Sequence, residues 1–299
     1  MSDVSWFADK KNKTRRVLQH TQHKLQGKRP VVVSLTSYSP RIGTVWQTVR
    51  SIFGQSYLPD KIVLYLAKSD FPNREADLPE SLTSMLWHDF EIRWVDDDLK
   101  PHKKYFWAFQ EFKDALVITI DDDLLYRREM VEDLVAGHER FPQAVIASRI
   151  HLIAFNDDGS IKPYEQWPQE MSMHDPRFVG VPSMRLLATT GAGTLFDPAL
   201  FPPLTFNADV IRRNVLTADD IWLKVVEAAA GIPVVATASG TPLEVTPNTQ
   251  EVALFISNSG QGINDRSLQA LQDDPVVQAE LKAPLPQLLR DDSLDALLE

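Results

Sequence analysis

Three consecutive aspartates follow an apolar run in VITIDDDLLY, the stretch from Val117 to Tyr126. Neighbouring carboxylates repel one another, and burying an ionised carboxylate is costly unless a positive charge meets it. If the backbone stays extended, Asp121 and Asp123 project to the same side, about 6.6 Å apart, while Asp122 points away. Such a pair could hold Mg²⁺ or Mn²⁺, hard ions that bind carboxylate and phosphate oxygens and so recruit a nucleotide diphosphate. The alternative is a solvated turn.

A second triplet, Asp96 to Asp98 in WVDDDLK, also follows an apolar strand, so one triplet alone proves little. It lies shortly before Pro101, and a polar turn between strand and loop explains it. The triplet after Ile120 differs, because its strand is more wholly apolar and Leu124 follows at once. We therefore expect the cation site at the later triplet and a polar turn at the earlier one.

A further acidic pair occurs in LTADDIWLKVVEA. Thr217 suits the N-cap of a helix, which would place Asp219 and Asp220 in the first turn, where the helix dipole favours carboxylates. That structural role alone explains both acids. The functional alternative is that one of them acts as a general base toward an incoming hydroxyl. The position on the helix leaves both interpretations open.

Two weaker signals accompany these acids. The strand TTGAGTLF contains Gly191 and Gly193, and glycine inside a strand often marks the close approach of a ligand or another backbone. Its spacing fits neither a dinucleotide fingerprint nor a P-loop. In KPHKKYFWAFQE, one of Lys100, Lys103 and Lys104 could neutralise phosphate oxygens as a point charge, or the lysines could begin a solvated helix.

Short β-rich runs alternate with helical patterns from Pro30 onward. This alternation favours an α/β fold with a largely parallel sheet covered by helices on both faces. The stretch 155–182 has no clear period and is expected to form a long loop over a site, where Trp167 could stack on a sugar or base. The expected strands lie within 31–38, 61–67, 90–95, 115–120, 144–148, 186–201 and 232–237, and the expected helices within 42–55, 81–87, 103–112, 129–141 and 217–231.

The composition limits the class of protein. With 299 residues, 43% of them hydrophobic, the chain can bury a sizeable core as one large domain or as a domain with an appendage. The absence of cysteine excludes disulfides, thiolate metal sites and a cysteine nucleophile, and it fits a reducing cytoplasm. No apolar run approaches the roughly 20 residues that span a bilayer, and no signal peptide is recognisable. We expect a cytoplasmic protein.

The formal net charge of −10 is unevenly spread. Residues 1–29 hold eight Lys or Arg against two Asp, so the rest of the chain is strongly acidic and nucleic acid is not expected as a partner. The basic segment could touch anionic lipid at the inner membrane face or form a solvated leading helix. The expected division is a basic segment over 1–29, a main domain over 30–240 and a C-terminal extension over 241–299 that packs on or near the active site.

Several stretches form an ordered set: VVVSLTSYSPRIGTVWQTVRSIFGQSYLPDKIVLYLA, DDDLKPHKKYFWAFQE, VITIDDDLLY, TTGAGTLF and ADDIWLK. In this order they resemble bacterial glycosyltransferases of the GT-A fold, similar to the family 2 type, over Pro30 to Thr237. The resemblance implies transfer of a sugar from a nucleotide-diphospho-sugar donor to a hydroxyl of a glycan or glycolipid acceptor, with Mn²⁺ or Mg²⁺. Bacterial surface polysaccharide synthesis is the expected setting.

The resemblance also assigns residues by position. Asp123 would be the principal metal ligand, and Asp121 would face the ribose or the water shell of the metal. Asp220 corresponds to the base of inverting members, while Asp219 stands where glutamate is more common, which puts the task of Asp219 in doubt. The candidate substrate-binding residues are Thr36, Tyr38 and Arg41 in the nucleotide loop, Lys103, Lys104, Asp121, Asp122 and Asp219, and Gly191, Ala192 and Gly193 beside the donor sugar and acceptor.

Three other functions share some of these features. Haloacid-dehalogenase phosphatases also place two aspartates, two apart, after an apolar strand, but their motif continues with Thr or Val, whereas Leu124 and Leu125 follow here. A nucleotidyltransferase would share the acidic metal site, yet the first loop SLTSYSPRIG is poor in glycine. A non-catalytic protein that binds nucleotide-sugars with the same fold is the remaining alternative.

Overall fold

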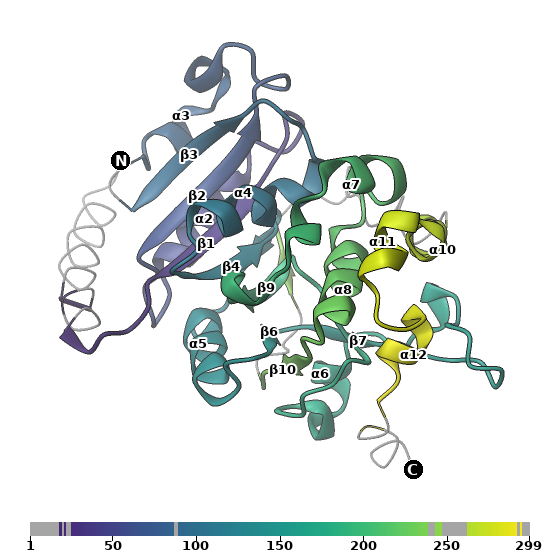
Figure 1. Ribbon diagram of the computed structural model, residues 1–299. Coiled ribbons are helices and arrows are strands. Elements are labelled where there is room, and N and C mark those ends of the chain that lie inside the picture. Colours follow the sequence, from purple (N-terminus) through teal and green to yellow (C-terminus); the bar gives the residue numbers. More distant parts are fainter. Residues whose placement is uncertain are drawn as a thin grey trace.

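The computed structural model describes residues 18, 19, 21, 25–86, 89–238, 243–246, 262–291 and 294. Its centre is a seven-stranded sheet with the order β10-β6-β9-β4-β1-β2-β3 (Figure 1). These strands are β1 (Val31–Thr36), β2 (Lys61–Ala67), β3 (Phe90–Val95), β4 (Leu116–Ile120), β6 (Val145–Ala147), β9 (Ala192–Phe196) and β10 (Val234–Ala236). β9 pairs antiparallel with β4 and β6, and the other neighbours pair in parallel. The predicted α/β class with a mostly parallel sheet is confirmed.

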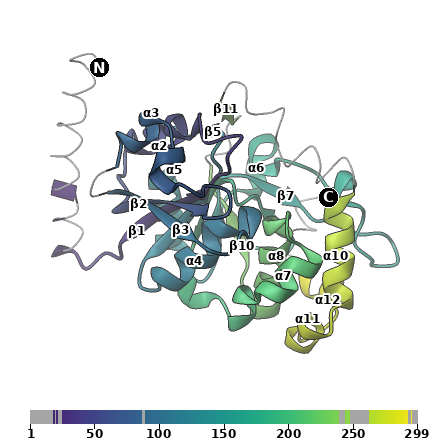
Figure 2. The same ribbon diagram turned by 90° about the horizontal axis from the view of Figure 1, so that it is seen from above.

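Helices cover both faces of this sheet (Figure 2). Successive side chains of a strand point to opposite faces, and in β1 Val31 and Val33 pack toward α2 and α5 while Val32 packs toward α4 and α8. A fully buried valine or leucine contributes about 1.5–3 kcal/mol, so each strand is held from both sides. The helices concerned are α2 (Val45–Phe53), α4 (Lys103–Glu111), α5 (Met130–Arg140), α7 (Ala208–Asn214) and α8 (Asp219–Ala230).

Helix α8 is buried along most of its length, which fixes its position against the sheet. Its buried Lys224 is satisfied, because the ammonium lies 2.9 Å from a Glu227 carboxylate oxygen and also donates to the Leu186 carbonyl of the neighbouring chain segment. The helix ends at Gly231, whose φ of 72° is a left-handed cap that glycine adopts without strain. The rigid helix therefore sets where its first residues, Asp219 and Asp220, can lie.

Two sequence predictions about these elements are wrong in detail. The helix begins at Asp219 with Ala218, not Thr217, at the N-cap. The single strand predicted over 186–201 is two strands, because the chain turns between them and the Ala192 N–H donates to the Thr189 carbonyl at 3.0 Å. The first of them, β8 (Leu186–Ala188), pairs antiparallel with β7 (Ile150–Leu152) in a separate sheet.

The stretch 155–182 contains more structure than the sequence pattern suggests. It includes α6 (Met171–His174) and the short 3₁₀ helices η3 (Tyr164–Gln166) and η4 (Pro176–Phe178). The Trp167 side chain is only 3% exposed, and its indole N–H donates to the Lys162 carbonyl at 2.8 Å. The proposal that Trp167 stacks on a ligand is therefore wrong, because its ring is part of the core.

The earlier aspartate triplet is paired one by one with cations. Asp96 binds Lys68 at 2.8 Å, and Asp97 binds Arg212 of α7. Asp98 accepts from Lys103 and from a second lysine. These pairs join the turn after β3 to its neighbours, which agrees with the predicted polar turn.

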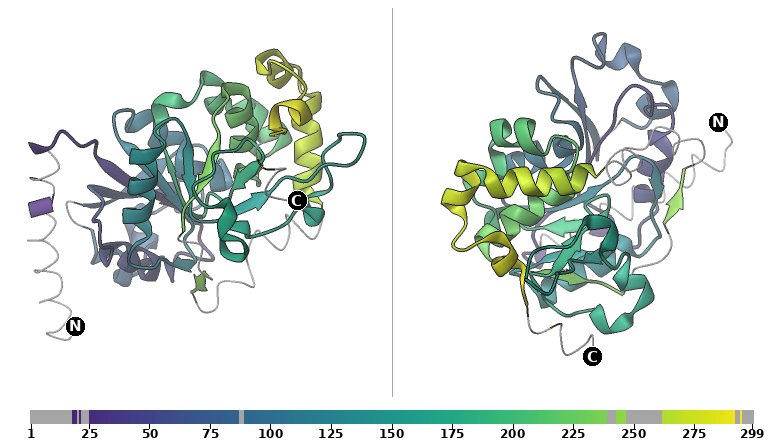
Figure 3. Two further views of the ribbon diagram at one scale, coloured as in Figure 1. Left: turned by 90° about the horizontal axis from the view of Figure 1, so that it is seen from below. Right: turned by 90° about the vertical axis from the view of Figure 1, so that its right-hand side faces the viewer.

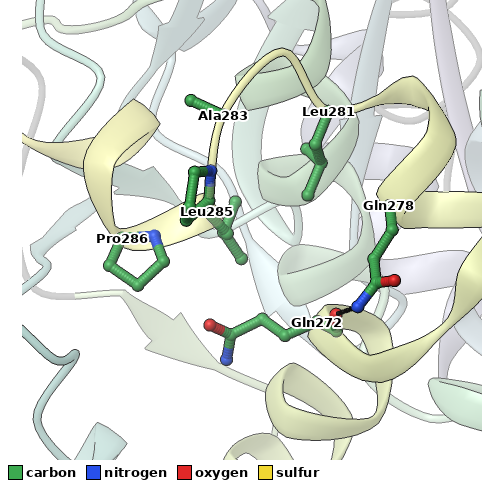
Figure 4. A pocket seen from close by; sticks show the side chains of 7 residues that line it. Gln272, Gln278, Leu281, Ala283, Leu285 and Pro286 are labelled. Carbon is green, nitrogen blue, oxygen red and sulfur yellow. Dashed lines mark hydrogen bonds between the residues drawn. The ribbon is translucent and has the colours of Figure 1, made fainter.

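Among the described residues, the C-terminal part packs around α7 and α8 (Figure 3). β11 (Glu244–Val245) pairs with β5 (Leu124–Leu125), directly after the later aspartate triplet. Helices α10 (Ile263–Asp273), α11 (Pro275–Glu280) and α12 (Leu285–Leu289) follow. They enclose a pocket of about 380 Å³ lined by Gln272, Gln278, Leu281, Ala283, Pro284, Leu285 and Pro286 (Figure 4), none of which is a candidate site residue.

The remaining short elements are α3 (Glu80–Thr83) and the 3₁₀ helices η1 (Arg74–Asp77), η2 (Lys100–His102), η5 (Pro198–Leu200) and η6 (Pro203–Phe206). Arg29, at the end of the basic segment, is anchored by two hydrogen bonds to the Asp197 carboxylate. None of the helices within the described ranges combines the length and hydropathy that a membrane crossing requires. The three-part division of the chain and membrane contact by its basic segment stay predictions.

Asp274 links the C-terminal helices to the main domain and provides a test of this packing. Its carboxylate caps α11 by accepting from Val276 N–H at 2.9 Å, and it accepts from Arg213 and Asn214 of α7, both at 2.7 Å. We expect Asp274→Ala to lower the free energy of unfolding by about 1–3 kcal/mol in urea titrations. The matched control is Asp273→Ala, which removes an exposed carboxylate. An equal loss in both variants would contradict the account.

Candidate active site

The candidate residues gather at one edge of the central sheet. β1, β4 and β6 run in the same direction, so their carboxyl ends lie at the same edge, where ligands bind in α/β proteins. The later aspartate triplet follows β4 at this edge, and the first turn of α8 reaches it. Arg41, Lys104, Gly191 and the aspartates 121, 122, 123, 219 and 220 are brought together there.

A buried lysine joins the two acidic motifs. The Lys104 ammonium lies 2.7 Å from Asp121 Oδ1 and 3.0 Å from Asp219 Oδ2, and the Lys104 side chain is only 3% exposed. Burial alone would lower the pKa of Lys104, but Asp121 and Asp219 outweigh it and raise the pKa above its usual value. Lys104 is therefore charged, and it holds the end of β4 against the start of α8.

Asp121 remains accessible although Lys104 binds one of its oxygens. Its side chain is 43% exposed, and in the described part of the chain its Oδ2 accepts no hydrogen bond. Burial would raise the pKa of Asp121, but the Lys104 ammonium, with Arg41 and Arg149 farther away, holds it below its usual value. The carboxylate is thus ionised near neutral pH.

Gly191 makes room for this carboxylate. A Cβ atom at Gly191 would lie 1.8 Å from Asp121 Oδ2, a distance that no side chain can tolerate. The Asp121 N–H donates to the Gly191 carbonyl at 3.0 Å, and the Tyr126 hydroxyl donates to the same carbonyl. Gly191 therefore makes room for a carboxylate of the site, and it lies in the turn before β9, not inside a strand. Its place beside a ligand stays a prediction.

The other two aspartates of the triplet meet a different cation. β4 ends at Ile120, and Asp122 and Asp123 lie in a turn, so the extended geometry assumed from the sequence does not hold. Arg41 Nη2 lies 2.8 Å from Asp122 Oδ1 and also pairs with Asp123. The Ser37 hydroxyl donates to the second oxygen of Asp122. Asp122 therefore does not point away from Asp123, because both carboxylates share the Arg41 guanidinium.

Burial raises the pKa of Asp122 to about 6, although Arg41 and the Ser37 hydrogen bond oppose the shift. Arg41 itself is buried, and its Nε donates no hydrogen bond within the described residues. A buried donor without an acceptor is costly.

Asp219 and Asp220 are joined by one hydroxyl. The Thr190 Oγ1 atom lies 2.7 Å from Asp219 Oδ2 and 2.5 Å from Asp220 Oδ1, and the Thr190 N–H donates to Asp220 at 2.9 Å. A hydroxyl has one proton to donate, so both contacts are favourable only when one carboxyl also carries a proton. Asp219 is bound to Lys104, so Asp220 is the better holder of that proton. Burial, with the Asp219 charge second, raises the pKa of Asp220 to about 6.

The remaining predicted residues are placed as follows. Lys103 lies apart, because its ammonium is buried against Asp98. The Thr36 hydroxyl donates to the Tyr65 carbonyl of β2 at 2.7 Å. Burial raises the pKa of Tyr38, the nearby Arg41 charge opposes this rise, and the Asp122 charge adds to it. Ala192 and Gly193 begin β9, and Gly193 has a φ of 93°. Substrate binding by these five residues stays a prediction.

Besides Ser37, whose hydroxyl donates to Asp122, three residues of the site were not predicted. Thr190 stands directly before the glycine that was noted, but threonine there gave no signal of its own. Tyr126 ends the stretch that carries the aspartates, and its hydroxyl accepts from the Asp121 N–H at 2.9 Å. Arg149 follows β6, far from every motif, and only the folded chain brings its charge near Asp121.

The site offers two carboxylates to a divalent cation. Within the described residues, no group of three or more His, Asp or Glu side chains is arranged to hold a metal ion. The oxygen chemistry nevertheless fits Mg²⁺ or Mn²⁺, since these ions are often held by one or two carboxylates together with water and phosphate. Asp121 has an accessible oxygen for such an ion, whereas the Asp123 carboxylate would have to bind the ion and Arg41 at the same time.

No protein-family model matches this chain, and no curated protein matches it. Among solved structures, S. aureus TarS 1–349 in complex with UDP is 13% identical with a TM-score of 0.47, covering 87% of this chain and 69% of that chain. The mannosyltransferase PcManGT from Pyrobaculum calidifontis, with GDP-Man and Mn²⁺, is 12% identical with a TM-score of 0.47, covering 98% and 86%.

The 4-diphosphocytidyl-2C-methyl-D-erythritol synthase from Anaerococcus prevotii is 10% identical with a TM-score of 0.42, covering 78% of this chain and 96% of that chain. The matching structures thus include GT-A-like glycosyltransferases and a nucleotidyltransferase-type fold. This likeness concerns the course of the chain and says nothing about its chemistry.

The raised pKa of Asp220 predicts a dependence of stability on pH. Because its pKa is about 6 in the fold, against an ordinary value of 3.8 for an aspartate, ionising Asp220 destabilises the folded state progressively as the pH rises through this range. Asp220→Asn mimics the protonated form and should raise the free energy of unfolding by about 1–3 kcal/mol at about pH 8. The difference should shrink as the pH falls and vanish at about pH 3 or below, where the carboxyl is protonated in both states.

Urea titrations at the two pH values measure this difference. Asp219→Asn is the matched control and should destabilise the protein, because it weakens the ion pair with Lys104. If Asp220→Asn lowers the stability at high pH as Asp219→Asn does, the assignment of the proton to Asp220 is wrong.

Proposed function

We propose that this protein is a metal-dependent glycosyltransferase that moves a sugar from a nucleotide-diphospho-sugar to a hydroxyl of a glycan or glycolipid, with inversion. The observation that carries the proposal is the placement of Asp220, whose pKa is raised to about 6, beside the accessible Asp121 carboxylate at the ligand-binding edge of the sheet. The sequence resemblance supports the same reaction and adds bacterial surface polysaccharides as the setting.

The charge of the site supports the use of a cation. Five aspartates, at 121, 122, 123, 219 and 220, surround the cations Arg41, Lys104 and Arg149. The net charge of these groups is negative, so a donor diphosphate would be repelled without added positive charge. Mg²⁺ or Mn²⁺, when held by Asp121 and Asp123, would supply that charge and stabilise the departing nucleoside diphosphate.

Asp220 would act as the general base. It would take the proton of the acceptor hydroxyl while the oxygen attacks the anomeric carbon and the bond from that carbon to the diphosphate oxygen breaks. A base is most effective when its pKa lies near the working pH, and a pKa of about 6 meets this condition better than that of an ordinary aspartate. The Thr190 N–H and hydroxyl hold the carboxylate in place, and Lys104 keeps Asp219 beside it.

The nucleotide would lie on the β1 side of the site. Tyr38 and Arg41 come from the loop after β1, and the unmet Arg41 Nε donor faces a buried, acidic surrounding. The same arginine neutralises Asp122 and Asp123. Arg41 would therefore hold the triplet in shape on the nucleotide side of the site.

The direct test is release of nucleoside diphosphate from UDP-, GDP- and dTDP-sugars, with Mn²⁺ and with EDTA. We expect one donor to react, EDTA to abolish release, and Asp123→Ala to reduce it by at least about 100-fold, because charge stabilisation by a bound metal contributes several kcal/mol. Asp96→Ala in the other triplet is the matched control. Its carboxylate is 87% exposed and, among the described residues, pairs with Lys68 alone, so release should be unchanged.

Two results would contradict the proposal. If no donor reacts and neither UDP nor GDP binds in a metal-dependent way, the non-catalytic alternative is favoured. If NMR shows that the product keeps the anomeric configuration of the donor, Asp220 is not the base of an inverting transfer.

A further inference from the structure

Arg149 is a cation of the site to which the proposed reaction assigns no task. It follows β6 and precedes β7, two strands that lie near α6 in Figure 1. The preceding residue, Ser148, donates its N–H to the Gly193 carbonyl of β9 at 3.0 Å. Arg149 therefore stands where β6 leaves the sheet, at the same edge as Asp121.

The Arg149 side chain is fixed through its Nε atom, while the terminal nitrogens of its guanidinium have fewer contacts. Its Nε donates to the Thr189 hydroxyl at 2.8 Å, and the Thr189 N–H donates back to the Arg149 carbonyl at 3.1 Å. Nη1 lies 3.6 Å from a Glu170 oxygen, which is too long for a hydrogen bond, and the side chain is 27% exposed. A fixed guanidinium with donors to spare suits a planar, two-oxygen anion.

The three cations of the site differ in how far their charge is compensated. Arg41 and Lys104 each contact two carboxylates at hydrogen-bonding distance. Among the described residues, Arg149 has only the Glu170 carboxylate within 4.0 Å. Burial and Asp220 raise the pKa of Tyr164, and the Arg149 charge opposes this rise. The same charge adds to the lowering of the Asp121 pKa, after Lys104 and Arg41. Arg149 thus carries the least neutralised positive charge of the three.

The position of Arg149 separates it from the nucleotide side. The loop with Tyr38 and Arg41 follows β1, whereas β6 lies beyond β4 and β9 in the sheet order. The hydroxyl of Thr189 accepts from Arg149, and the next residue, Thr190, donates its N–H to Asp220 at 2.9 Å. The stretch 155–182 supplies another neighbour, Glu170. A substrate group on Arg149 would therefore be close to the proposed base and far from the nucleotide loop.

Resting on the proposed function, we propose that Arg149 binds an anionic group of the acceptor, a carboxylate or a phosphate, next to the hydroxyl that reacts. Asp121, Asp219 and Asp220 would repel an acidic acceptor if no cation compensated them. Arg149 supplies that compensation on the acceptor side. The preferred acceptors are therefore acidic glycans, such as those with uronic acids or sugar phosphates.

The test measures binding to protein loaded with Mg²⁺ and with UDP or GDP, whichever binds, so that the donor site is filled. The probes are p-nitrophenyl β-D-glucuronide, p-nitrophenyl β-D-glucoside and the 6-phosphate of that glucoside, observed by saturation-transfer NMR. We expect both anionic probes to bind about 10- to 100-fold more tightly than the glucoside, the range for hydrogen bonds to charged groups. Arg149→Gln should remove this preference, and Arg149→Lys should keep part of it.

Arg177→Gln is the matched control, because Arg177 is an exposed arginine of the same stretch that pairs with Asp175. It should leave the preference for anionic probes intact. A second measurement is the NMR signal of the Arg149 Nε–H group, assigned through Arg149→Lys, which should shift with the glucuronide and not with the glucoside.

The outcomes separate this inference from the proposed function. If neither UDP nor GDP binds with Mg²⁺ and no donor is hydrolysed, the proposed function fails first. If nucleotide binds but the anionic probes bind no better than the glucoside, the inference is overturned while the transferase stands. If Arg149→Gln weakens the binding of the nucleoside diphosphate instead, Arg149 serves the donor and the inference is likewise wrong.

Discussion

The site depends on one buried ammonium. Lys104 of α4 lies between Asp121 at the end of β4 and Asp219 at the start of α8, three elements that are distant in sequence. Breaking a buried ion pair by removing one partner typically costs about 3–5 kcal/mol, because the other charge is left without compensation. This shared charge holds the two acidic motifs at a fixed separation. The remaining features of the site follow from that separation.

The environment gives similar carboxylates different tasks, a pattern known from enzymes that use two acids. Asp121 has Lys104 beside it and stays ionised, which suits it to a cation. Asp220 has the charge of Asp219 beside it, and within the described residues its hydrogen-bond donors are the hydroxyl and N–H of Thr190. Burial first and the Asp219 charge second raise its pKa to about 6. One acid is thereby suited to binding and the other to proton transfer.

The sequence predicts the order of strands and helices well, because apolar periodicity reports local burial. It does not predict that β9 runs antiparallel or that the chain turns before it, since periodicity carries no direction. The sequence also fails to predict contacts between side chains that come from different strands and helices. The extended geometry predicted for the triplet was wrong, because β4 ends at Ile120 and Asp122 and Asp123 lie in a turn where both pair with Arg41. Lys104 was noted as a phosphate contact, but its charge is taken by two carboxylates, and nothing local marked Thr190.

The account is tested most directly by titrating the aspartates of the protein labelled with ¹³C at the side-chain carboxyl. The chemical shift of each carboxyl carbon reports its own protonation, independently of any substrate or metal. We predict that Asp220 titrates with a pKa of about 6, while Asp121 titrates below its usual value. If Asp220 titrates as an ordinary exposed aspartate, with a pKa of about 3.9, it lacks the raised pKa that the proposed base requires, and the proposed mechanism is contradicted.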